Sequence, residues 1–199
     1  KEDNRYYNSA IMLTPDQTQF YNKNQLMPFG EYWPFKSLFK TFGLSNIIPG
    51  SEFEKGTHLT PFKLNNITIG TAICLETTVP HYFRHYSKQQ VDILVSLVNN
   101  GWFKESSIAK RQLQMLQIRA IECGRPTLQS ANMGYSVAIS PTGVIIDKIP
   151  QFEQSFITIN LPLSKINTPY TIIGDSIILL SALILLVTII TNFKRLDLH

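Results

Sequence analysis

The fold is decided by the stretch NITIGTAICLETTVP, residues 66–80. Its first part alternates large apolar residues with small or polar ones, which predicts a β-strand that ends at Cys74. Two threonines and Pro80 follow, and this order is typical of the first turn of a helix. A strand that passes through a cysteine into a helix places the thiol at the edge of a sheet. The positive end of the helix dipole then favours the thiolate, the nucleophilic form.

On both sides of this stretch the sequence alternates between predicted strands and one long predicted helix. We expect strands at 9–13, 91–98, 127–132, 136–140 and 144–149, and a helix at 107–123. We expect the helix to turn five apolar residues inward: Leu113, Leu116, Ala120, Met115 and Ile118. The pattern predicts an α/β domain with mixed strand directions.

The composition excludes several classes of function. Hydrophobic residues make up 44% of the 199 residues, and the net charge is only +4. Lysine and arginine are spread along the chain without a basic stripe, so nucleic acid is not an expected partner. Two cysteines, Cys74 and Cys123, cannot form a disulfide framework, and the four histidines show no metal-ligand spacing. We therefore expect no metal and no organic cofactor.

The C-terminal end is strongly apolar. Seventeen uncharged residues, 177–193, would form a helix about 25 Å long, close to the thickness of a bilayer's hydrocarbon core. A buried core helix is the alternative. The membrane interpretation divides the chain into a catalytic domain at 1–165, a linker at 166–175, a transmembrane helix at 176–193 and a tail at 194–199. Lys194 and Arg195 predict a cytoplasmic tail, with the domain on the outer face of the membrane.

The N-terminal end, KEDNRYYNSAIML, has neither a start methionine nor a secretory segment. Polar residues lead directly into a predicted strand. We therefore expect this chain to be the C-terminal part of a longer protein.

Four sequence blocks follow one another in order: KNQLMPFGE at 23–31, CLE at 74–76, NNGWF at 99–103 and RAIECGRP at 119–126. Together they resemble the nitrilase superfamily, and within it the bacterial apolipoprotein N-acyltransferases. The stretch NTPY at 167–170 and the apolar end of the chain match the same branch. The resemblance implies an α-β-β-α sandwich, incomplete at its N-terminus, followed by one C-terminal transmembrane helix.

The resemblance also implies a reaction in the bacterial inner membrane, on its periplasmic face. Such enzymes move an acyl chain from a phospholipid, through a cysteine thioester, to the N-terminal amine of an S-diacylglyceryl-cysteine apolipoprotein. Cys74 matches the nucleophile and Lys23 the group that holds the oxyanion. Glu31 and Glu76 would orient Lys23 and relay protons. The backbone N–H of Leu75 would be a second oxyanion donor.

Substrate contacts are expected from Leu75, Trp102 and Asn100. Trp102 has two interpretations, a lipid-facing lid or a core tryptophan. The segment 35–42 carries phenylalanines and lysines at helical spacing. This pattern also has two interpretations: the segment rests in the membrane interface, or it packs against the domain's own core.

Taken alone, the candidate residues also have ordinary structural interpretations. Cys74 would be a small buried apolar residue, Lys23 a solvated loop lysine, and each glutamate the partner of a surface cation. Cys123 is interpreted only as a buried apolar residue, without a catalytic role. Only the combination of blocks favours catalysis.

Three features depart from the family pattern. The superfamily's general base is a glutamate that would lie before this chain begins, and Glu2, in a polar leader, does not replace it. Leu75 stands where a tyrosine is usual, and Gln112 where a histidine is frequent. Two other functions therefore remain open: a nitrilase-type amidase acting on a small C–N substrate, and an inactive fragment of the acyltransferase.

Overall fold

The computed structural model describes residues 5–44 and 52–196, with the backbone alone for 192–196. Its centre is a six-stranded sheet in the order β3-β4-β5-β6-β7-β8. The strands are β3 (Phe62–Leu64), β4 (Ile67–Ile73), β5 (Ile93–Asn99), β6 (Thr127–Asn132), β7 (Ser136–Ile139) and β8 (Ile145–Ile149). The middle strands β4, β5 and β6 run parallel, and the outer pairs are antiparallel. The carboxyl ends of three strands therefore share one edge.

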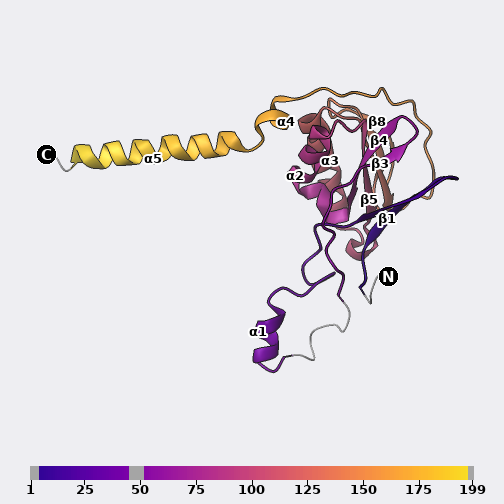
Figure 1. Ribbon diagram of the computed structural model, residues 1–199, viewed down its shortest axis with the longest axis horizontal. Coiled ribbons are helices and arrows are strands. Elements are labelled where there is room, and N and C mark those ends of the chain that lie inside the picture. Colours follow the sequence, from indigo (N-terminus) through magenta and orange to yellow (C-terminus); the bar gives the residue numbers. More distant parts are fainter. Residues whose placement is uncertain (1–4, 45–51, 197–199) are drawn as a thin grey trace.

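Two helices cover one face of this sheet, α2 (Pro80–Lys88) and α3 (Ile108–Cys123) (Figure 1). The core between them is apolar and includes Phe83, Tyr86, Leu94 and Leu116, each at most 1% exposed. Strand β4 approaches α2 closely because residue 70 is glycine. A Cβ atom there would lie 2.7 Å from Cγ of Tyr86 and 2.9 Å from Cδ2 of Leu94.

A separate hairpin, β1 (Ser9–Leu13) and β2 (Thr18–Asn22), lies beside the β3 edge of the sheet. The side chain of Gln19 fixes it there. Its Nε2 donates to the carbonyl of Lys63 at 2.7 Å, and its Oε1 accepts from the Lys63 N–H at 2.9 Å. Of the predicted α-β-β-α sandwich, the described residues therefore form one helix layer, one full sheet and this hairpin.

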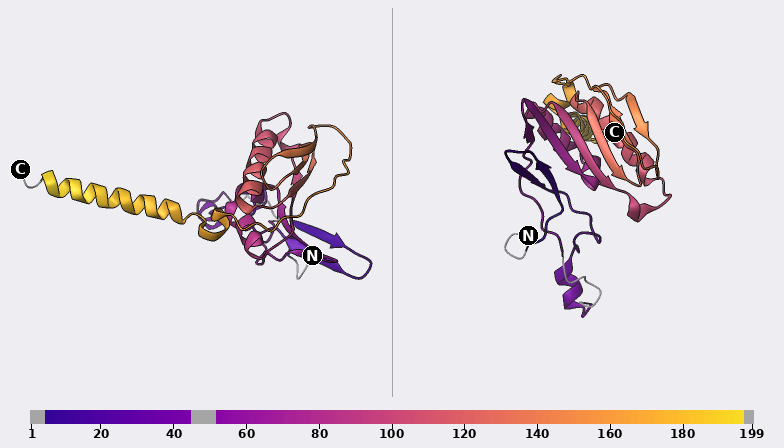
Figure 2. Two further views of the ribbon diagram at one scale, coloured as in Figure 1. Left: turned by 90° about the horizontal axis from the view of Figure 1, so that it is seen from above. Right: turned by 90° about the vertical axis from the view of Figure 1, so that its right-hand side faces the viewer.

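Within the segment between β2 and β3, residues 32–44 extend from the domain as an arm (Figures 1 and 2). The arm carries the short helix α1 (Lys36–Thr41), in which no residue is buried. Trp33 stacks edge-on against both Phe29 and Phe39, with ring centroids 5.4 Å and 5.5 Å apart. The prediction that 35–42 packs into the core of the domain is therefore wrong.

Two arginines attach the C-terminal segment to the domain. Arg125, completely buried, donates to five carbonyl groups, among them those of Val91 at 2.7 Å and Ile166 at 2.7 Å. Arg84 donates to the carbonyls of three consecutive residues, 170–172, at the end of helix α4 (Pro169–Ile173). These contacts fix where the chain leaves the domain, and α4 lies inside the stretch predicted as a linker.

The last helix, α5 (Ser176–Leu196), projects away from the domain (Figures 1 and 2). Its apolar side chains between Ile177 and Ile190 are exposed. Within the part of the chain that the structure describes, no helix has both the length and the apolar character needed to cross a bilayer. The transmembrane span predicted at 176–193 is therefore not confirmed. Of the predicted tail at 194–199, the last three residues lie outside the described residues.

Most predicted elements are confirmed within one or two residues, including β1, β6 and α3. The prediction for the inner face of α3 is wrong at two positions. Met115 and Ile118 are 37% and 46% exposed, whereas Leu113, Leu116 and Ala120 are buried.

Candidate active site

Cys74 lies where β4 ends and the short 3-10 turn η2 (Cys74–Thr78) begins. Its φ is 51°, in the left-handed region that non-glycine residues rarely adopt. Such backbone strain costs of the order of 1–3 kcal/mol and is concentrated at functional sites. The thiol is half-buried and forms no disulfide. The predicted strand–cysteine–helix order is thus present, with η2 and α2 forming the helical part.

Lys23 and Glu31 form an ion pair on the segment that follows β2. The Nζ of Lys23 lies 2.7 Å from Oε2 of Glu31, and Lys23 is only 2% exposed. Glu31 also accepts hydrogen bonds from Nδ2 of Asn8 at 2.6 Å and from the N–H of Met27 at 2.7 Å. Burial by itself would raise the pKa of Glu31, but these hydrogen bonds, first that of Lys23, lower it below its ordinary value. Glu31 is therefore ionised, and its carboxylate holds Lys23 in place.

Glu76 is completely buried in η2 and accepts four hydrogen bonds. Its Oε1 accepts from the Tyr21 hydroxyl at 2.9 Å and from the N–H groups of Asn24 and Gln25 at 2.5 Å and 3.0 Å. Its Oε2 accepts from the Ile73 N–H at 2.7 Å. Burial raises the pKa of Glu76, and these hydrogen bonds oppose that rise. Glu76 thus joins the segment after Lys23 to the end of β4.

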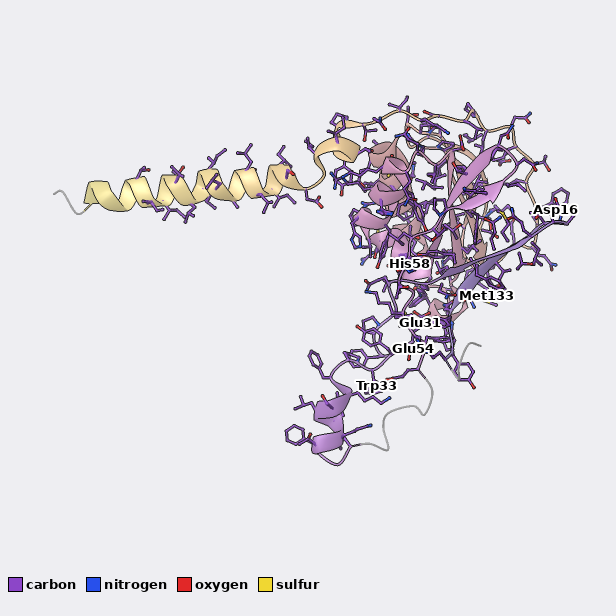
Figure 3. All side chains as sticks on the ribbon, viewed as in Figure 1. Asp16, Glu31, Trp33, Glu54, His58 and Met133 are labelled. Carbon is purple, nitrogen blue, oxygen red and sulfur yellow. The ribbon has the colours of Figure 1, made fainter. Side chains whose placement is uncertain are left out.

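One cavity of about 710 Å³ brings Cys74 and the ion pair together. Sixteen residues line it: Asn8, Ser9, Lys23, Met27, Gly30, Glu31, Phe53, Ile73, Cys74, Leu97, Val98, Asn99, Trp102, Phe103, Ser130 and Asn132. Its wall is mostly apolar apart from the ion pair and a few amide and hydroxyl groups. In Figure 3, Glu31 lies at the rim of the domain, where the arm that bears Trp33 begins.

The predicted substrate-binding residues have different positions. Trp102, in the turn η3 (Gly101–Phe103), lines the cavity and is 85% exposed, so the interpretation as a core tryptophan is wrong. Leu75 does not line the cavity, but it lies in the first turn of η2, where N–H groups have no partner within the helix. The side chain of Asn100 is buried outside the cavity lining, against Gly134. Glu2 lies outside the described residues.

Sequence reasoning missed one neighbour of Cys74. Gln112 is buried on the inner face of α3, and its Nε2 lies 3.9 Å from Sγ of Cys74, so it is placed to donate a weak hydrogen bond. The departure from the family pattern at this position therefore affects the surroundings of the thiol. Cys123, in contrast, is completely buried in the core, and burial raises its pKa to about 12.

Asn99 and Asn132 were also missed as cavity residues. They are the last residues of the neighbouring parallel strands β5 and β6 and pair with each other in register. The signal available in the sequence was their position at strand ends, where ligands bind in α/β sheets. Among residues 5–44 and 52–196, no cluster of acidic, histidine or cysteine side chains is arranged to hold a metal ion.

Comparison with known proteins agrees with this geometry. A sequence profile described as carbon-nitrogen hydrolase matches residues 1–168. The chain belongs to the carbon-nitrogen hydrolase family. Two solved structures share the fold of this carbon-nitrogen hydrolase chain at low identity. A carbon-nitrogen hydrolase from Helicobacter pylori G27 has a TM-score of 0.61 and 16% identity, over 77% of this chain and 56% of that one. A superfamily member from Xanthomonas campestris has a TM-score of 0.58 and 18% identity, over 77% and 57%.

Curated relatives of this carbon-nitrogen hydrolase chain are named apolipoprotein N-acyltransferase. The protein from Pasteurella multocida is 32% identical over 94% of this chain and 37% of its own length. The protein from Haemophilus ducreyi is 33% identical over 89% of this chain and 37% of its own length. The resemblance inferred from the sequence blocks is confirmed. The chain spans little more than a third of the length of these relatives.

Proposed function

We propose that this chain carries the acyl-transfer site of an apolipoprotein N-acyltransferase. One observation carries the proposal: Cys74 opens onto the same apolar cavity as the Lys23–Glu31 ion pair. A nucleophile and a fixed cation at one cavity are what acyl transfer requires, and an apolar wall suits an acyl chain. The similarity to proteins named apolipoprotein N-acyltransferase supports the choice of reaction.

In the first half-reaction, the sulfur of Cys74 attacks the ester carbonyl of a phospholipid. The carbonyl oxygen gains negative charge, which the ammonium of Lys23 and the N–H of Leu75 stabilise. The C–S bond forms, the bond from the acyl carbon to the glycerol oxygen breaks, and that oxygen takes up the proton released by the thiol. The products are a thioester on Cys74 and a lysophospholipid.

The two glutamates position groups rather than react. Glu31 has a lowered pKa and is occupied by three donors, so at neutral pH it has no proton to relay. It fixes the direction of the Lys23 side chain. Glu76 lies outside the cavity and fixes the backbone beside Lys23 through Asn24 and Gln25. The general base is, in this proposal, the glutamate that the family resemblance places before Lys1.

The lipid would enter past the aromatic residues of the arm and Trp102. Phe35, Leu38 and Phe42 on the arm are exposed, and Trp102 is exposed at the cavity. Apolar and aromatic side chains next to lysines are typical of surfaces that rest in a membrane interface. The arm and Trp102 are therefore suited to pass an acyl chain from the bilayer to Cys74.

The membrane would be the bacterial inner membrane, with the domain on its periplasmic face and α5 buried in lipid at 176–193. The exposed apolar side chains of α5, from Ile177 to Ile190, support this part of the proposal, because such a surface is unfavourable in water. Lys194 and Arg195 support the orientation.

In the second half-reaction, the N-terminal amine of the apolipoprotein attacks the thioester carbonyl. The C–N bond forms, the C–S bond breaks and its electron pair returns to sulfur. The proton lost by the amine ends on the thiol. The product is an amide-linked acyl chain on the lipoprotein, and Cys74 is free again.

Mass spectrometry in liposomes tests the first half-reaction, with the chain joined to the upstream segment that supplies the general base. A phospholipid with an isotopically labelled acyl chain is added, and the peptide that contains Cys74 is examined for a hydroxylamine-sensitive mass increase. We expect the label on Cys74 in the unsubstituted chain and no label in Cys74→Ala. Cys123→Ser is the matched control and should load normally.

Other results would contradict the proposal. If no label reached Cys74 while a small amide was hydrolysed, the chain would be a nitrilase-type amidase. If neither reaction occurred in the longer protein, Cys74 would have no catalytic role, and if only the longer protein loaded, the chain by itself would be an inactive fragment. Labelling that persisted in Cys74→Ala would exclude Cys74 as the nucleophile.

A further inference from the structure

Three strand ends lie in a row at the catalytic edge of the sheet. Cys74 directly follows β4, Asn99 ends β5 and Asn132 ends β6. The register places Ile73 opposite Leu97 and Asn99 opposite Asn132. Both asparagines line the cavity that contains Cys74, on the side of β4 away from β3 in the strand order. They are therefore available to a molecule that reacts at the cysteine.

The hydrogen bonds between these side chains determine which atoms remain free. The N–H of Gly101 donates to Oδ1 of Asn99 at 3.1 Å, and Nδ2 of Asn132 donates to the same oxygen at 3.1 Å. A backbone N–H can only donate, so the atom that it meets must be the oxygen of Asn99, and the second donor must be the nitrogen of Asn132. Two donors occupy that oxygen. Nδ2 of Asn99 and Oδ1 of Asn132 remain for a ligand.

The two atoms without a partner are one donor nitrogen and one acceptor oxygen, both uncharged, and Nδ2 of Asn132 keeps a second N–H. A phosphate is a poor match for this pair, because phosphates are bound by cations and by several donors. The nearby cation, Lys23, is already paired with Glu31. One donor beside one acceptor instead matches the N–H and C=O of a single extended residue, which point to the same side of its strand.

We propose that Asn99 and Asn132 bind the N-terminal residue of the acceptor polypeptide. Oδ1 of Asn132 accepts a hydrogen bond from the α-amine, and Nδ2 of Asn99 donates to the carbonyl of that same residue. This inference rests on the proposed function, because the bound amine is the group that attacks the thioester on Cys74. The amine held through one N–H keeps its lone pair for the acyl carbon, and its proton ends on the departing sulfur.

The subsite would give the reaction its selectivity. An α-amine with a carbonyl two bonds away can use both asparagines and keep its lone pair free, whereas a lysine ε-amine that keeps its lone pair free can use only Asn132. Both side chains are exposed, so the selectivity requires the bound acceptor to exclude water from them; an analogue that lacks the carbonyl then leaves a donor unpaired.

The test separates the two half-reactions. The same protein in liposomes, with the upstream segment, is first loaded with labelled phospholipid, and loading is quantified on Cys74. It is then mixed with either of two acceptors, an S-diacylglyceryl-cysteinyl peptide or the matching S-diacylglyceryl-cysteamine, which has the amine but no carbonyl. The rates of thioester loss and amide formation are measured by mass spectrometry.

Two variants and one control are compared. Asn99→Asp keeps the oxygen that Gly101 and Asn132 need but removes the free donor. Asn132→Leu removes the free acceptor at similar volume. Asn65→Asp is the control, because Asn65 is an exposed residue of the turn between β3 and β4.

Transfer is measured per loaded Cys74, because both asparagines line the cavity and the charge added in Asn99→Asp also acts on the loading step. Transfer to the peptide should fall by about ten- to a hundredfold in Asn99→Asp and Asn132→Leu and stay unchanged in Asn65→Asp. The preference of the unsubstituted chain for the peptide over the cysteamine should disappear in Asn99→Asp. Normal loading with unchanged transfer and preference in both variants would overturn the subsite and leave the proposed function intact. Absence of loading in the unsubstituted chain would overturn both.

Discussion

Lys23 and Glu31 are eight residues apart in the sequence, and their side chains meet at 2.7 Å inside the cavity that contains Cys74. The ammonium is almost completely buried, and the carboxylate is held by two further donors. A cation fixed in this way needs no reorganisation when negative charge develops on a bound carbonyl oxygen, which is the condition for efficient electrostatic catalysis.

The first prediction concerns Lys23. Lys23→Met should lower the rate of thioester formation on Cys74 by about a hundredfold or more, because the oxyanion loses a preorganised cation. It should also reduce the free energy of unfolding by about 3 kcal/mol, because Glu31 is left buried without its partner. The measurements are single-turnover loading with labelled phospholipid and urea unfolding in detergent.

The matched control for Lys23 is Lys165→Met. Lys165 also pairs with a carboxylate, Asp92, at 3.0 Å, but its side chain is 49% exposed. Loss of such a pair should cost no more than about 1 kcal/mol and leave loading unchanged. Equal effects of the two variants on loading would show that Lys23 has no special role.

The second prediction follows from the pKa of Glu31. Because that pKa is lowered from 4.5 in the folded chain, ionised Glu31 stabilises the fold above pH 4.5, and this contribution is lost as pH falls through the lowered value. Glu31→Gln should therefore be less stable than the unsubstituted chain at pH 7, by about 1–3 kcal/mol. The difference should shrink below pH 4.5. Thermal unfolding between pH 3 and pH 7 measures it.

Glu52→Gln is the comparison for Glu31. Glu52 also bonds a lysine, Lys36, at 2.7 Å, but on the more exposed arm. Its substitution should change the stability of the domain by less than about 1 kcal/mol at every pH. A difference for Glu31→Gln that stayed constant down to pH 3 would contradict the assignment of Glu31 as a carboxylate.

The strands and the long helix could be predicted because their patterns are local. The alternation before Cys74 is the pattern of a strand with one buried face, and the apolar run in β5 is the pattern of a strand with two buried faces. The inner face of α3 was predicted too wide. Leu113, Leu116 and Ala120 follow the spacing of one helix face, whereas Met115 and Ile118 lie beside that stripe, and only the packing of α3 on the sheet shows how narrow it is.

The site was predicted in part for a similar reason. Cys74, Lys23 and Glu31 were found because each belongs to a recognisable block, and the structure places all three at one cavity. Asn99 and Asn100 are neighbours in one block, and the sequence does not show which of them faces the cavity. That depends on where β5 ends and η3 begins. Contacts between distant elements, such as Gln112 with Cys74, have no local pattern at all.

The third prediction concerns the reactivity of the two cysteines. Iodoacetamide at pH 8 should modify Cys74 and leave Cys123 unmodified in the folded chain. Cys74 is half-exposed at the cavity, whereas burial of Cys123 raises its pKa to about 12 and blocks access. Peptide mass spectrometry measures the modified fraction. Modification of Cys123 at a comparable rate would contradict the described core.

The fourth prediction concerns Glu76. Glu76→Gln should reduce the free energy of unfolding by about 1–3 kcal/mol. The reason is that the NH₂ group of the new amide would face an N–H group whose hydrogen bond Glu76 accepts in the unsubstituted chain. It should also increase hydrogen exchange at the N–H groups of Asn24 and Gln25. Glu54→Gln, an exposed glutamate, is the control and should change neither quantity. Unchanged exchange at both amides in Glu76→Gln would show that Glu76 does not position the segment beside Lys23.

The fifth prediction concerns the junction between the domain and α5. Gly174 has a φ of +56°, and a Cβ atom there would lie 2.5 Å from Cζ of Arg84. Gly174→Ala should therefore displace the Arg84 guanidinium from the carbonyls at the end of α4 and loosen α5 relative to the domain. Gly43→Ala is the matched control, because Gly43 has a φ of +72° and nothing within 4 Å of the added atom. Both variants place alanine at a positive φ, and the ψ of -135° at Gly174 adds to its strain, but only Gly174→Ala displaces Arg84 and should be cleaved faster by protease between the domain and α5. Equal cleavage rates in the two variants would show that Arg84 does not hold this junction.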